Sequence, residues 1–187
     1  MKLIVINGPS LAALGTREVE VFGKKDYDFL CQQIVKKAAA SNILIEIYQS
    51  NHEGDIIDRI HQSYADGTTG IIINPAAFAH YSYAIYDALM SVPIPKVQVH
   101  LADLNTREEA WRHQNVIGPA CNEVIMGRGY DGYLDAIDYM IKNNAEYTAE
   151  EIVKAQEGSE SCNMSDKERL TLEEAKKAEE RKKMVEK

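Results

Sequence analysis

The sequence predicts an α/β domain in which five parallel strands alternate with helices. Short runs rich in β-branched residues are separated by longer segments whose apolar residues recur at helical spacing. Alternation of this kind implies a parallel sheet with helices on both faces, because parallel strands need crossover connections. With five strands, the common order is 2-1-3-4-5. A chain of 187 residues is long enough for one such domain and an extension.

The strand segments are short apolar runs bounded by turn residues or polar breaks. In order, they are Leu3 to Ile6, Ile43 to Tyr48, Gly70 to Ile73, Lys96 to His100 and Glu123 to Met126. The first and third strands end in Asn-Gly-Pro and Asn-Pro sequences, which are typical of turns.

Four segments between and after the strands have the spacing of amphipathic helices. They run from Tyr27 to Ala38, from Ile56 to Tyr64, from about Tyr81 to Leu89 and from about Tyr133 to Ile141. Asp26 is a candidate N-cap for the first of them, and Asp66-Gly67 ends the second. Residues 146–187 form a charged extension with two capping-box signals, for which a peripheral tail and a role in assembly are both open.

Composition excludes several classes of function. The formal net charge of −8 argues against a nucleic-acid binder, which needs a concentrated basic surface. Three widely spaced cysteines suggest neither a disulfide framework nor a zinc site, so a reducing, cytoplasmic setting is expected. No run approaches the roughly 18 apolar residues of a membrane span. A small-molecule ligand or a protein partner is therefore expected.

The predicted topology places a site at the carboxyl ends of the first and third strands, where the strand order reverses. Asn7 to Ser10 follow the first strand and Asn74 to His80 follow the third, with His100 ending the fourth. His80 is a candidate proton donor or acceptor, because histidine exchanges protons near neutral pH. Polar groups are thus expected to converge at this edge of the sheet.

Three arginines lie in long loops near this edge. Arg17 belongs to the segment from Ser10 to Lys25, which has no secondary-structure signal and has the length of an active-site lid. Arg17 is either a lid residue over a bound anion or a solvated arginine, and the same alternatives hold for Arg107 and Arg112. No dinucleotide fingerprint, P-loop or G-x-S-x-G elbow is present.

A family resemblance follows from six sequence blocks in order. Ile6 to Pro9 and Leu14 to Glu18 resemble the opening of type II 3-dehydroquinate dehydratases. The later blocks are Gln49 to Gly54, Ile72 to Pro75 with His80, Val99 to Leu101, Arg107 to Glu109 and Gly127 to Tyr133. The resemblance covers about residues 1 to 143 and suggests a domain over 1–145.

The resemblance implies a flavodoxin-like subunit, trimers assembled into a dodecamer, and no metal or organic cofactor. The implied reaction converts 3-dehydroquinate into 3-dehydroshikimate and water by anti elimination through an enolate. In that family a loop tyrosine, activated by an arginine, removes a proton, and a histidine protonates the departing hydroxyl. By resemblance, Arg17 is the activating residue and His80 is the acid. The substrate-binding positions implied are Asn74, His100, Leu101, Ala102, Arg112 and Asp87, the last reaching a neighbouring subunit's site.

The departures from the family pattern concern chemistry more than fold. Phe22 occupies the tyrosine position and has no oxygen to accept a proton. Ser10 replaces the family's asparagine, Ala102 its serine and Gln98 its glutamate. Ala76-Ala77 replaces a Gly-Gly pair. The loop after Arg107 is one residue longer than in the family.

Two classes of function follow. Retention of His80, Arg17 and His100 favours a lyase, either weak on 3-dehydroquinate or redirected to another hydroxy acid. The changes at Phe22 and Ser10 favour a catalytically silent homologue that binds a ligand or scaffolds partners. A third possibility is that Phe22 was introduced deliberately to trap a ligand, but this would leave the other departures unexplained. Tyr27, on the apolar face of the first helix, is either a substitute base or a core residue.

Overall fold

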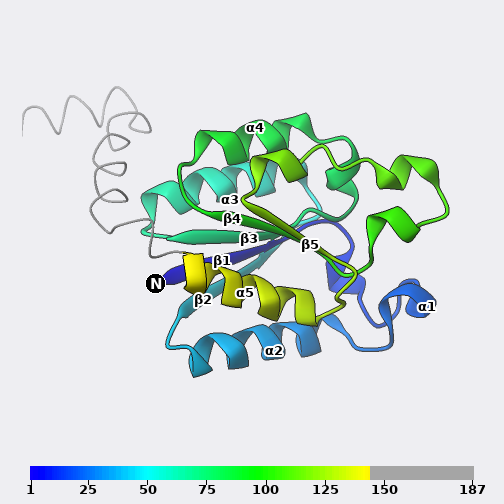
Figure 1. Cartoon of the computed structure of the whole chain (residues 1–187), viewed down its shortest axis with the longest axis horizontal. Coiled ribbons are helices and arrows are strands. Elements are labelled where there is room, and N and C mark those ends of the chain that lie inside the picture. Colours follow the sequence, from blue (N-terminus) through cyan, green and yellow to red (C-terminus); the bar gives the residue numbers. More distant parts are fainter. Residues whose placement is uncertain (144–187) are drawn as a thin grey trace, which may run out of the picture. The chain divides into compact units, whose positions relative to one another are not determined.

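A computed structural model describes residues 1–143 of the chain. The expected helices of the C-terminal extension lie outside these residues. Five parallel strands form one sheet in the order β2-β1-β3-β4-β5, which confirms the predicted fold class and strand order (Figure 1). The strands are β1 Lys2–Asn7, β2 Leu44–Gln49, β3 Gly70–Asn74, β4 Lys96–His100 and β5 Glu123–Met126.

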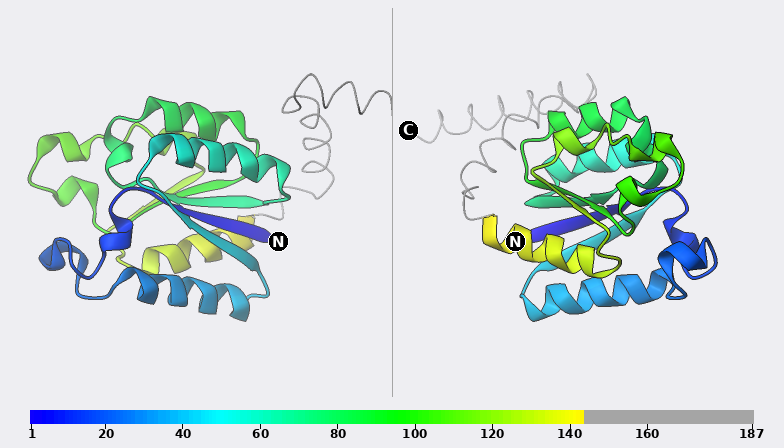
Figure 2. Two further views of the ribbon diagram at one scale, coloured as in Figure 1. Left: turned by 180° about the vertical axis from the view of Figure 1, so that it is seen from behind. Right: turned by 45° about the vertical axis from the view of Figure 1, so that its right-hand side comes forward.

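Four longer helices cover the two faces of the sheet (Figures 1 and 2). α2 (Tyr27–Ala40) and α5 (Asp131–Asn143) lie on one face, and α3 (Glu53–Ala65) and α4 (Tyr83–Ser91) lie on the other. Alternate residues of β1 enter the two cores, because successive side chains of a strand point to opposite faces. Leu3 and Val5 join the first core and Ile4 and Ile6 the second. All four are completely buried.

Local capping explains where two of the helices begin. The Asp26 carboxylate accepts a hydrogen bond of 2.8 Å from the Phe29 N–H, which confirms the predicted N-cap of α2. α4 begins at Tyr83, two residues later than expected, because the Ser82 hydroxyl accepts from the Ile85 N–H at 3.0 Å. Tyr81 instead follows the short 3₁₀ helix η2 (Ala76–His80). Within residues 1–143, no helix is long and apolar enough to cross a membrane.

The loop after β1 has more structure than its sequence indicated. The segment from Ser10 to Lys25 has no secondary-structure signal in the sequence, yet it contains η1 (Leu11–Ala13) and the single-turn helix α1 (Val19–Phe22). The Tyr130 hydroxyl donates to the Lys25 carbonyl at 2.5 Å and anchors the end of this loop. The long loop between β4 and β5 likewise contains three 3₁₀ helices, η3 (Leu104–Thr106), η4 (Ala110–His113) and η5 (Gly118–Ala120).

The ends of β1 and β3 approach each other very closely. The Gly8 N–H donates to the Asn74 carbonyl at 2.8 Å. A Cβ atom at Gly8 would lie 2.5 Å from the Pro75 carbonyl oxygen, so a side chain cannot be accommodated without moving the backbone. Glycine at this position therefore brings together the two strand ends where the site was expected.

The turn after β3 contains a strained backbone conformation. Ala76 has a φ of 50°, in the left-handed region that favours glycine. The side-chain oxygen of Asn74 accepts a hydrogen bond of 3.2 Å from the Ala76 N–H and holds the turn. Alanine therefore retains a glycine-like backbone here, at a cost of roughly 1–2 kcal/mol for an L-residue.

We expect Ala76→Gly to raise the free energy of unfolding by up to about 1 kcal/mol, because it relieves the left-handed strain while adding freedom to the unfolded chain. Chemical denaturation would measure the change. Ala77→Gly is the matched control, because Ala77 has no positive φ. It should lower stability by about 0.5 kcal/mol. Equal losses in both variants would contradict the assignment of strain to Ala76.

Candidate functional site

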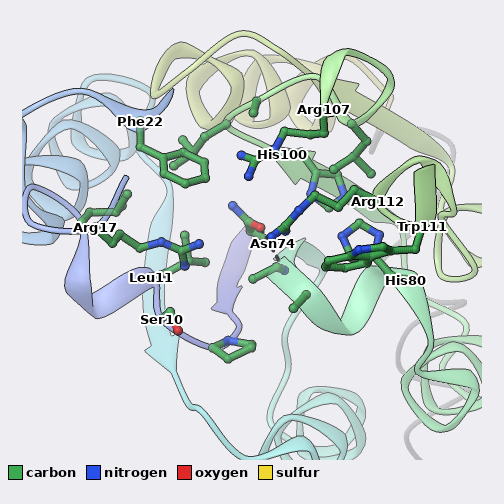
Figure 3. A pocket seen from close by; sticks show the side chains of 17 residues that line it. Ser10, Leu11, Arg17, Phe22, Asn74, His80, His100, Arg107, Trp111 and Arg112 are labelled. Carbon is green, nitrogen blue, oxygen red and sulfur yellow. Dashed lines mark hydrogen bonds between the residues drawn. The ribbon is translucent and has the colours of Figure 1, made fainter. Parts of the chain in front are cut away.

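A pocket of about 220 Å³ opens at the carboxyl edge of the sheet (Figure 3). It lies between the loop after β1, η2 and the loop after β4. Arg17 and Phe22 lie on one side, His80 and Trp111 lie on the other, and Asn74 lies between them (Figure 3). The full lining is Pro9, Ser10, Leu11, Leu14, Arg17, Phe22, Asn74, Ala76, Ala77, His80, His100, Leu101, Ala102, Leu104, Arg107, Trp111 and Arg112.

Ten residues occupy catalytic or substrate-binding positions by resemblance, and the structure brings nine of them to this one pocket. Asp87 is the exception, because it is exposed on α4 and does not line the pocket. Its reach into a neighbouring subunit stays a prediction. Sequence reasoning left the place of Arg107 open and did not single out Trp111. Both lie in the loop after β4, where helical or strand periodicity gives no signal.

Asn74 is held in place by a buried hydrogen-bond network below the pocket. Its side-chain amide donates to the Tyr133 hydroxyl at 2.9 Å, and that hydroxyl donates to the Asn7 side-chain oxygen at 2.7 Å. The Asn7 amide in turn donates to the Tyr27 hydroxyl at 3.2 Å. Burial raises the pKa of Tyr133 well above its usual value. The network therefore fixes Asn74 with neutral partners.

Tyr27 is poorly suited to serve as a substitute base. It does not line the pocket, and it packs against the core on the face of the sheet that α2 and α5 cover. Burial raises the pKa of Tyr27 to about 12, which keeps its hydroxyl protonated at neutral pH. The structure therefore favours a packing role for Tyr27 in the core over a role as a base.

The Phe22 ring lies between two arginines. The guanidinium carbons of Arg17 and Arg107 are 4.9 Å and 5.8 Å from its centroid. Glu18 bridges the same pair, with one carboxylate oxygen 2.8 Å from Arg17 and the other 2.7 Å from Arg107. Hydrogen bonds from Arg17 and then Arg107 hold the pKa of Glu18 below its usual value. The aromatic position thus lies in a strongly cationic environment, partly neutralised by one carboxylate.

Ser10 also has a backbone conformation unusual for its residue type. Its φ is 64°, and its N–H donates to the Asn51 side-chain oxygen at 2.9 Å. Asparagine adopts this left-handed conformation more readily than serine does. The backbone at the pocket's edge therefore has a conformation that suits an asparagine better than a serine.

His80 is positioned to exchange a proton. Its Nδ1 lies 2.7 Å from the Gln114 carbonyl oxygen, which can only accept, so Nδ1 carries a proton. Nε2 is then the ring atom that can gain or lose a proton. The Trp111 ring packs edge-on against His80, with centroids 5.1 Å apart. The imidazole is thereby fixed in orientation at the pocket wall.

His100 is in a different electrostatic environment. It is 4% exposed, and its Nε2 lies 2.8 Å from the Gln98 side-chain nitrogen. Burial lowers the pKa of His100 to about 4, and the positive charge of His80 acts in the same direction. His100 is therefore neutral at physiological pH.

The remaining wall combines a cation with apolar surface. The Arg112 guanidinium lies 4.3 Å from the Trp111 ring centroid, and its Nε is 3.0 Å from a Glu109 carboxylate oxygen. Leu11, Leu14, Leu101 and Leu104 supply apolar surface. Several guanidinium groups beside two histidines suit a small, polar anion such as a carboxylate. In the part of the chain that is described, no cluster of side chains has the composition of a metal site.

Comparisons with known proteins agree with this geometry. The family model described as "Dehydroquinase class II" matches residues 1–141. A 3-dehydroquinate dehydratase of Lachnoclostridium phytofermentans is 51% identical over 144 residues, which cover 77% of this chain and 99% of that protein. A 3-dehydroquinate dehydratase of Thermotoga neapolitana is 46% identical over 146 residues, covering 78% of this chain and 98% of its own.

Solved structures give the same result. The type II dehydroquinase from Butyrivibrio crossotus is 50% identical with a TM-score of 0.74, covering 75% of this chain and 97% of that one. A 3-dehydroquinate dehydratase-like protein from Bifidobacterium longum is 29% identical with a TM-score of 0.56, covering 74% and 94% of the two chains. The sheet order, the pocket and these similarities together show that this chain belongs to the type II dehydroquinase family.

Proposed function

We propose that this protein is a hydro-lyase of the 3-dehydroquinate dehydratase type whose activity on 3-dehydroquinate is weak because Phe22 occupies the position of the proton acceptor. The position of the Phe22 ring between Arg17 and Arg107 carries this proposal. A tyrosine hydroxyl at this ring would lie in a cationic environment that favours its ionised form. Phenylalanine fills the same volume and has no atom that can take a proton.

The remaining groups support the other steps of an elimination. Arg112 and the loop arginines provide cations for a substrate carboxylate, and Asn74 provides a fixed polar side chain at the pocket floor. His80 carries a proton on Nδ1 and can deliver another from Nε2 to a departing hydroxyl when the ring is protonated. The substrate class proposed is therefore a small polyhydroxy carboxylate.

A ligand-binding or scaffold protein without turnover is the second candidate, and a lyase redirected to another hydroxy acid is a variant of the first. The two arginines beside Phe22 favour the binding role, because Glu18 can offset only one of their two charges and the remaining positive charge can bind an anion without a proton acceptor. Loss of one general base typically lowers the rate of the chemical step by about 10²- to 10⁴-fold. The groups that bind the ligand are not affected by this loss.

Assembly into trimers and a dodecamer belongs to the same proposal. α4 exposes Tyr83 and Met90, and Tyr81 precedes it, so this helix presents large apolar side chains beside Asp87. Such a surface suits a protein contact. We propose that a second copy of the chain covers it and that Asp87 thereby approaches the neighbouring pocket.

Restoring the phenol is the direct test. We expect Phe22→Tyr to increase the formation of 3-dehydroshikimate by about 10²- to 10⁴-fold, because it supplies the missing proton acceptor beside two arginines. An absorbance assay on the purified full chain measures the rate. Phe29→Tyr is the matched control, because it adds the same hydroxyl to an aromatic residue outside the pocket and should change nothing.

Absence of any gain in Phe22→Tyr would count against the dehydratase proposal and would favour the binding role. In that case, the pocket departures at Ser10 and Ala102 would have reshaped the site beyond the loss of the base.

In the Phe22→Tyr background, we expect His80→Gln to reduce kcat by about 10²- to 10⁴-fold with a smaller change in KM, because glutamine cannot deliver a proton. Steady-state kinetics separates the two constants. A rise in KM at unchanged kcat would instead assign His80 to ligand binding alone.

A further inference from the structure

A chain of hydrogen bonds runs from the backbone of η5 to His100 at the pocket. We infer that Gly118, Asn115 and Gln98 act as positioning residues that hold His100 in the neutral tautomer with its proton on Nδ1. Each side-chain amide is fixed in orientation by the preceding group, beginning with the backbone N–H of Gly118.

The first contact fixes the orientation of Asn115. The Gly118 N–H lies 3.1 Å from the Asn115 side-chain oxygen. A backbone N–H can only donate, so the oxygen of Asn115 must face it. A Cβ atom at Gly118 would lie 2.8 Å from the Asn115 amide nitrogen, so glycine leaves the space in which this amide sits.

The second contact transfers that orientation to Gln98. The Gln98 amide nitrogen donates to the Asn115 oxygen at 2.9 Å, and the Asn115 nitrogen donates to the Gln98 oxygen at 3.0 Å. Rotating the Gln98 amide by 180° would bring two oxygens together and two nitrogens together. Gln98 is completely buried, so water cannot compensate for such a mismatch.

The third contact sets the tautomer of His100. The Gln98 amide nitrogen, fixed by Asn115, lies 2.8 Å from Nε2 of His100. An amide nitrogen donates and does not accept, so Nε2 must present its lone pair. The proton of the neutral ring is therefore on Nδ1.

The identity of residue 98 decides this outcome. A glutamate there would accept a hydrogen bond from Nε2–H and would stabilise the charged imidazolium ring, whereas the glutamine donates to Nε2 and opposes protonation. The other charged or titratable groups that line the pocket are Arg17, His80, Arg107 and Arg112. Glu18 and Glu109 pair with these arginines, whereas a positive charge on His80 opposes one on His100.

The consequence concerns what each histidine can do for a bound ligand. Nε2 of His100 is occupied by Gln98, so Nδ1–H is the polar group of this ring that remains for a ligand, and it is a donor. His100 is thus suited to bind an acceptor oxygen, such as a carbonyl, and not to release a proton. This assignment of roles rests on the proposed function of the pocket, whereas the tautomer itself does not.

Nitrogen-15 NMR of histidine-labelled full-length protein tests the tautomer directly, because protonated and lone-pair ring nitrogens differ strongly in chemical shift. His100→Gln identifies the signals of His100. We expect the native protein at neutral pH to give a neutral His100 with the proton on Nδ1. A proton on Nε2, or a charged ring, would overturn the inference. The readout needs no turnover, so failure of the dehydratase proposal leaves it intact.

Two variants test the series of hydrogen bonds from Gly118 to His100. Gln98→Glu should move the proton of His100 to Nε2 and make the ring protonate at higher pH, while Gln32→Glu, an equal charge change at an exposed position of α2, should leave both unchanged. Asn115→Ala leaves Gln98 in place but removes the partner that fixes its orientation. The Gln98 amide should then be able to rotate, and a measurable fraction of His100 should carry its proton on Nε2. An unchanged His100 tautomer in Asn115→Ala would show that the chain does not set it.

Discussion

The pairing of β1 with β3 places Asn7 opposite Asn74 at the carboxyl end of the sheet. Tyr133 of α5 joins the two strands, because its hydroxyl donates to Asn7 at 2.7 Å and accepts from Asn74 at 2.9 Å. Tyr133 is completely buried, so these polar groups depend on one another for their hydrogen bonds. A shift of one residue in this register would leave them unsatisfied, and the pocket floor would lose its fixed polar side chain.

The loops above this floor concentrate positive charge around the ring of Phe22. Arg17 and Arg107 still flank the aromatic position, and Glu18 holds both of them. The same arrangement that would favour an ionised phenol can bind an anion without one. The cations that could bind an anion are therefore independent of any proton acceptor at position 22.

The two pocket histidines differ through their partners and not through their residue type. His80 contacts a backbone carbonyl, whereas His100 contacts a side-chain amide that donates to it. A carbonyl tolerates a positive ring, and a donating amide opposes it. The contacts of His80 are therefore compatible with a protonated ring, whereas those of His100 favour a neutral one.

The sequence by itself determined the five strands, the four longer helices, the sheet order and the edge at which polar residues converge. These features depend on periodicity and turn residues, which are local properties of the chain. Only the tertiary structure showed α1 and the position of Arg107. Arg107 is held by Glu18, and these two residues are 89 positions apart in the sequence. It also showed that Asn115 and Gly118 are linked to His100 by hydrogen bonds through Gln98. Such contacts leave no periodic pattern, since they depend on where separate loops meet.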